Sequence, residues 1–303
     1  MQRAETEPTA AEAVYECLFE DLRWDHACDE RDSYLAGLIH RLGLPLAPME
    51  RRILDEISAS REARPRAGSA YRARRQEATE ASLDDLVRGV ATGGQERAHA
   101  LAELGRRGEH RVLDLAEEIC RDNPPAGVPG MSQALDHLGS AAVPRARVWS
   151  VGGSPTLARL GIRVLAEHGD TGDVGTLHAA LNGYVAGGDW CAAETPARGL
   201  GRIGAPDAVG DLMAAWEATP HSLARPNFLQ ALVGCRAPWA EACAEEGLFD
   251  CQEEVQILAC ATAPDSVGVR QRLREIARDP LVPQAHEAAD ARLQLLSEPC
   301  PTD

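Results

Sequence analysis

The six residues from Gly199 to Gly204, GLGRIG, have the glycine spacing of a loop that binds dinucleotide phosphates. Such a loop follows a buried β-strand and precedes a helix, so that its backbone N–H groups can reach the pyrophosphate. The residues before Gly199 include Pro196 and no run of β-branched side chains, which disfavours a strand. We therefore expect no nucleotide cofactor here, and the glycines need another explanation.

The densest group of potential metal ligands is His26-Ala27-Cys28-Asp29-Glu30, with Cys17 upstream. A zinc site needs several such side chains to converge on one point, and no C-x-x-C or H-x-x-x-H pair completes the set. We therefore predict no metal site. The cluster is interpreted as an acidic helix end that carries a buried cysteine.

Local patterns for covalent catalysis are missing from the sequence. There is no G-x-S-x-G motif, and no cysteine has the context of a known nucleophile. All 31 basic residues other than histidine are arginines, so Schiff-base and P-loop chemistry, which need lysine, are excluded. We assign no catalytic residue, although a triad scattered along the chain would leave no local pattern.

The segment EEGLFDCQEE at 245–254 places five carboxylates around Leu248 and Phe249. Runs of charge are commonly solvated loops, but an Arg-rich protein partner would complement this one. The residues that we predict to contact such a partner are Trp190, Trp239, Glu245, Glu246, Phe249, Asp250, Glu253 and Glu254.

The composition of the 303 residues indicates a soluble helical protein with an acidic surface. Aromatic residues make up only 4%, and alanine, leucine, glycine and arginine dominate, which favours helices packed through small side chains. The use of arginine alone indicates a GC-rich bacterial coding bias. A net charge of -16 disfavours nucleic acid as a partner and favours a basic protein.

Nine cysteines, an odd number without a C-x-x-C pair, indicate reduced thiols that act as small apolar residues. The first residues are polar and acidic, unlike a signal peptide, and no apolar run approaches the length of a membrane span. We therefore expect a cytoplasmic protein without a membrane partner.

A short motif recurs along the second part of the chain at intervals of 34, 30, 35, 32 and 26 residues. Ala-Pro pairs follow three of the copies at the same offset. Each unit is predicted as a helix, a tight turn with the motif glycine in the left-handed conformation, and a second helix that begins near the proline. In this interpretation Gly199 is an incidental small residue. The copies are LAELG at 101–105, LDHLG at 135–139, LAEHG at 165–169, LGRIG at 200–204, and the weaker LVGCR at 232–236 and LACAT at 258–262.

The region from 83 to 298 resembles HEAT-like repeats, in particular the short repeats of phycobilisome lyases. The resemblance implies an all-α protein, an alpha-alpha superhelix, with a solenoid of about six helix pairs. We expect a helical segment over 1–60 and an Arg-rich connector over 61–82 before it.

This architecture favours a non-catalytic scaffold or adaptor that binds a protein along the concave second-helix face. Two alternatives remain. One is a DNA-binding enzyme similar to the HEAT-like alkylpurine DNA glycosylases, which line a groove with Trp and basic residues. The other is an acidic inhibitor or immunity protein against a basic toxin. A di-iron site similar to that of deoxyhypusine hydroxylase is not expected, because only His286-Glu287 has the required order.

Overall fold

The computed structural model describes residues 76–122, 128–152, 154–279 and 282–297. The chain divides into two compact units, residues 1–80 and 81–303, and the helices named below belong to the second. These described residues form helices and no strand, which confirms the predicted all-α fold. The predicted helical segment over 1–60, most of the connector and the cluster at His26–Glu30 lie outside the described residues.

Each of the six sequence motifs lies in the last part of one helix or at its end, and a second helix follows it. The first helices are α5 (Gly94–Arg106), α7 (Met131–Leu138), α9 (Pro155–His168), α11 (Trp190–Ile203), α13 (Arg225–Gly234) and α15 (Glu253–Thr262). The second helices are α6 (Arg111–Asp122), α8 (Val143–Ser150), α10 (Val174–Ala186), α12 (Val209–Ala218), α14 (Ala240–Gly247) and α16 (Val267–Ile276). Helix α4 (Leu83–Thr92) precedes them, α17 (Pro283–Ser297) follows, and short 3-10 helices at Gly139–Ala142, Thr171–Asp173 and Pro206–Ala208 lead into α8, α10 and α12.

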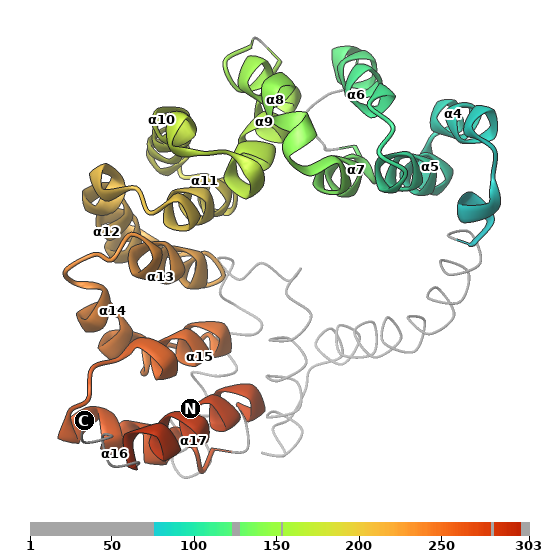
Figure 1. Ribbon diagram of the computed structural model, residues 1–303. Coiled ribbons are helices and arrows are strands. Elements are labelled where there is room, and N and C mark those ends of the chain that lie inside the picture. Colours follow the sequence, from blue (N-terminus) through green and yellow to red (C-terminus); the bar gives the residue numbers. More distant parts are fainter. Residues whose placement is uncertain (1–75, 123–127, 153, 280–281, 298–303) are drawn as a thin grey trace, which may run out of the picture. The chain divides into compact units, whose positions relative to one another are not determined.

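The first helices pack against one another from one repeat to the next, from α5 through α17, and form one layer (Figure 1). The second helices pack mainly on the first helix of the following repeat, as α8 does on α9 and α10 on α11. The packed pair is therefore a second helix with the next first helix, and the tight turn after each motif joins neighbouring pairs. This arrangement confirms the prediction of a helical repeat.

The leucines that open the motifs form the core between the layers. Five of them, Leu101, Leu135, Leu165, Leu200 and Leu232, are fully buried. Leu258, in the weakest copy, is only half-buried, and Ala259 beside it is buried instead. Trp216, on the second helix α12, is also fully buried.

Gly199 is not an incidental residue, which corrects the prediction made from the repeat. A Cβ atom at this position would lie 2.6 Å from Cα of Ala166 in α9 and 2.8 Å from its Cβ. Gly201 lies two residues later, on the opposite side of α11. A Cβ there would lie 2.5 Å from Cα of Ala231, so Gly201 approaches α13 as closely as Gly199 approaches α9. The first two glycines of GLGRIG thus let α11 approach the helices on both sides.

The third glycine of GLGRIG ends its helix in the left-handed conformation, as predicted. The motif glycines of α5 and α9 do not, so the prediction is wrong there. Gly204 is left-handed, with φ 74° and ψ 48°, and ends α11. Gly105 lies inside α5, where a Cβ would meet the backbone of Ala134 at 2.4 Å, and Gly169 is extended at φ −68°. In the motif at the end of α13, the fifth residue, which corresponds to Gly204, is Arg236. Arg236 adopts the left-handed conformation, with φ 53°.

No described helix is both long and apolar enough to cross a membrane.

Gly199→Ala tests the close approach of α11 to α9. We expect the free energy of unfolding to fall by about 1–3 kcal/mol, because the helices must separate to admit the methyl group. Gly183→Ala in α10 is the matched control, since a Cβ there would meet no atom within 4 Å. Ala is the better helix former, so this control should gain about 0.5–1 kcal/mol in urea denaturation. A Gly199→Ala protein as stable as the control would contradict the packing described above.

Arg236→Gly tests the strained turn after α13. A left-handed non-glycine residue costs about 1–2 kcal/mol, and part of that cost is offset by the greater chain entropy of glycine in the unfolded state. We expect a net gain of about 1 kcal/mol in the free energy of unfolding. Gly204→Ala, at the equivalent turn, should lose a similar amount, and opposite signs in thermal denaturation would support the repeat alignment.

Candidate functional site

Four of the eight predicted partner-binding residues lie on or beside α14. Trp239 is the N-cap of α14 and is 54% exposed, and Phe249, just past its end, is 67% exposed. Glu245 and Glu246 are exposed on the last turn of the helix, and Glu241 is exposed on its first turn. Glu241 and Glu245 are four residues apart and share one side of the helix. Together with Trp239, Glu246 and Phe249, these exposed side chains are here called the α14 face.

Two of the predicted acidic residues, Glu246 and Asp250, form ion pairs with Arg225 at the start of α13. Its guanidinium group lies 2.8 Å from Oε1 of Glu246 and 2.6 Å from Oδ2 of Asp250. The same group stacks on the Trp216 ring at 3.7 Å, and the indole N–H donates to Glu246 at 3.3 Å. The Asp250 side chain is only 6% exposed. Asp250 therefore neutralises a partly buried arginine, and its carboxylate is not presented on the surface.

The remaining carboxylates divide between structural and exposed positions. Glu253 accepts backbone N–H groups of Gln284 at 2.8 Å and Ala285 at 3.1 Å, at the start of α17, so it caps that helix. Glu254 is exposed and accepts a hydrogen bond from Gln252. Glu241 and Glu245 form no ion pair within the described part of the chain, which makes them the most available negative charges on the α14 face.

Trp190 lies apart from the α14 face, at the start of α11. Its ring meets Phe228 of α13 edge-on, with 6.5 Å between the ring centres. Both residues belong to first helices, whereas α14 is a second helix. The predicted partner-binding residues are therefore not one cluster in the structure.

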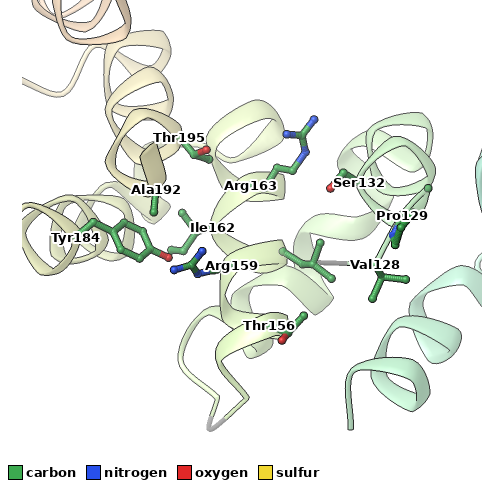
Figure 2. Close-up of a pocket in the computed structure, with 12 residues that line it drawn as sticks. Val128, Pro129, Ser132, Thr156, Arg159, Ile162, Arg163, Tyr184, Ala192 and Thr195 are labelled. Carbon is green, nitrogen blue, oxygen red and sulfur yellow. The ribbon is translucent and has the colours of Figure 1, made fainter. Parts of the chain in front are cut away.

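A cavity of about 520 Å³ opens beside α9 (Figure 2). Arg159 and Arg163 of α9 line it, together with Tyr184 of α10 and Thr195 of α11. Each arginine already pairs with an aspartate at 2.7 Å, Arg159 with Asp189 and Arg163 with Asp136. Arg159 also lies 5.8 Å from the centre of the Tyr184 ring, and burial raises the pKa of the tyrosine hydroxyl. Because each positive charge is paired with a carboxylate, the cavity does not favour a strongly anionic ligand.

The sequence predictions missed a cluster formed by Cys191, Glu194 and His221, beside Trp190. Cys191 and Glu194 share the first turns of α11, and His221 lies 30 residues after Cys191, one repeat further along. The repeat length could have revealed this cluster in the sequence, because residues one repeat apart lie next to each other in a stack of helices.

No protein-family model, curated protein or solved structure matches this chain.

Arg225→Met tests the ion-pair network beneath the α14 face. The substitution leaves the Asp250 carboxylate buried without a positive partner, and we expect the free energy of unfolding to fall by about 3 kcal/mol. Arg270→Met is the control, because its partner Asp265 is 46% exposed and exposed pairs contribute less than about 1 kcal/mol. Equal losses in urea denaturation for the two variants would show that Asp250 does not depend on Arg225.

Proposed function

We propose that this chain is a HEAT-like repeat protein that acts as a non-catalytic scaffold, and that it binds a basic segment of a protein partner on the α14 face. The observation that supports the proposal most directly is the exposure of two aromatic side chains, Trp239 and Phe249, beside the carboxylates of Glu241 and Glu245, which form no ion pair with the other described residues. Large aromatic residues contribute a disproportionate share of binding energy when a partner covers them.

The dimensions of the α14 face suit a short segment. Trp239 and Phe249 are ten residues apart on and around a helix that rises 1.5 Å per residue, so about 15 Å separates them along the axis. A helix of similar length or about five extended residues would span this distance. Apolar side chains of the segment would cover Trp239 and the side of the Phe249 ring away from Arg272, whose guanidinium carbon lies 4.8 Å from the ring centre. Arginine or lysine between them would meet Glu241 and Glu245.

The charge of the whole protein favours the same class of partner. A net charge of -16 attracts a basic protein over a distance and speeds its association, most strongly at low ionic strength. An acidic inhibitor of a basic toxin or nuclease would use the same surface, and the identity of the captured partner distinguishes that role from a general scaffold.

The test is affinity capture from the native host followed by binding measurements with the recovered protein. We expect the double variant Trp239→Ala/Phe249→Ala to weaken the affinity at least tenfold, because the rings form the centre of the contact. Glu241→Gln/Glu245→Gln should mainly slow association and reduce its dependence on salt.

Val148→Ala is the matched control, since Val148 is 63% exposed and lies on α8, three second helices before α14. It should bind as the unaltered protein does, and all variants should keep its melting temperature. A recovered partner that binds the Trp239→Ala/Phe249→Ala protein with unchanged affinity would contradict the proposed surface.

A further inference from the structure

The cluster of Cys191, Glu194 and His221 has the composition and spacing of a metal site. Each residue offers one ligand atom, and the three atoms lie within 4.8 Å of one another. This is the one such group of three His, Cys, Asp or Glu side chains in the described ranges. Cysteine sulfur, imidazole nitrogen and carboxylate oxygen together favour zinc among the divalent cations, whereas magnesium and calcium prefer oxygen ligands alone.

The backbone brings the three side chains together from two neighbouring repeats. Cys191 and Glu194 are three residues apart near the start of α11, so they share one side of that helix. His221 lies in the segment before α13, where its backbone N–H donates to the Thr219 hydroxyl at 3.1 Å and its carbonyl accepts from the backbone of Ala224 at 3.0 Å. The packing of α11 on α13 therefore positions all three ligand groups.

The distance between Sγ of Cys191 and Nε2 of His221 is 3.4 Å. Zinc binds cysteine sulfur at about 2.3 Å and histidine nitrogen at about 2.0–2.1 Å, so tetrahedral coordination separates the two ligand atoms by about 3.5 Å. The pair thus already has the separation that a shared zinc ion requires. Only the Glu194 side chain would need to adjust.

The groups around the cluster favour a cation over further ion pairing. Asn227 donates a hydrogen bond to Oε2 of the Glu194 carboxylate at 3.2 Å. Arg198, four residues after Glu194 on α11, is engaged by Glu167 through two hydrogen bonds of 3.0 and 2.6 Å. Cys191 is exposed, so an ion can enter.

We propose that Cys191, Glu194 and His221 bind one zinc ion through three protein ligands, with a fourth position open to water. Three protein ligands and one open position are the arrangement of zinc sites that act on substrates, whereas structural sites use four. The Nδ1 atom of His221 is buried without a hydrogen-bond partner among the described residues. Because such outer partners strengthen metal sites by about 10–100-fold, we expect weaker binding than in a structural zinc site.

The test is titration of the full-length, metal-free protein with zinc in competition with a coloured chelator. We expect one zinc ion per chain, and Cys191→Ser and Glu194→Gln should each weaken its binding at least tenfold. Cys251→Ser is the matched control, because Cys251 is the other exposed cysteine among the described residues and should bind zinc as the unaltered chain does. Zinc binding by Cys191→Ser at full affinity would overturn the proposal and place the ligands elsewhere in the chain.

Two measurements on the unaltered protein make the result independent of how the variants fold. Cobalt in place of zinc should give a thiolate-to-metal charge-transfer band and the strong visible bands of tetrahedral coordination. Zinc should also slow alkylation of Cys191 by iodoacetamide, seen by peptide mass spectrometry, and leave Cys251 equally reactive. A cobalt spectrum without a thiolate band, or Cys191 that reacts at the same rate with and without zinc, would equally overturn the proposal.

Discussion

The close approach of the first helices is the constraint on which the rest of the repeat depends. Gly199 and Gly201 on opposite sides of α11 leave no room for a Cβ against Ala166 and Ala231, and Gly105 meets Ala134 in the same way. Side chains of ordinary size at these points would push the helices apart. The shortage of aromatic residues and the abundance of alanine and glycine are therefore consequences of the packing distance in this layer.

Close packing also determines which side chains can meet. When neighbouring helices nearly touch along their centres, long polar residues at the edges of the contact reach across to the next repeat. Arg198 reaches Glu167 and Arg163 reaches Asp136 in this way, and Asn227 reaches Glu194. The cluster of Cys191, Glu194 and His221 lies in the same kind of position. In this fold, the polar side chains that meet in these contacts are about one repeat apart in the sequence.

The fold could be predicted from the sequence because the motifs carry the leucines and turns that every unit needs. The role of the motif glycine, however, could not be transferred from one copy of the motif to the next. Gly204 ends its helix, but Gly105 lies within one, since a glycine is required both where the chain turns and where helices touch. Gly199 looked replaceable because other copies have alanine or larger residues there. The need for glycine depends on the local separation of α9 and α11, which the sequence of one unit does not encode.

The acidic segment shows a similar limit at the candidate site. Its five carboxylates look alike in sequence, yet Asp250 balances Arg225, Glu253 caps α17 and Glu245 faces outward. The partners of the first two lie 25 and about 31 residues away, so composition alone could not separate them from an available charge.

The α14 face and the metal-ligand cluster belong to different layers of the repeat, which has a consequence for how their functions relate. Trp239 and Phe249 flank a second helix, whereas Cys191 and Glu194 are on a first helix. Substitutions in one set leave the contacts of the other in place. A scaffold needs only its exposed face, whereas the proposed zinc ion would lie between α11 and the segment before α13. Partner binding and metal binding can therefore fail separately, and loss of one carries no implication for the other.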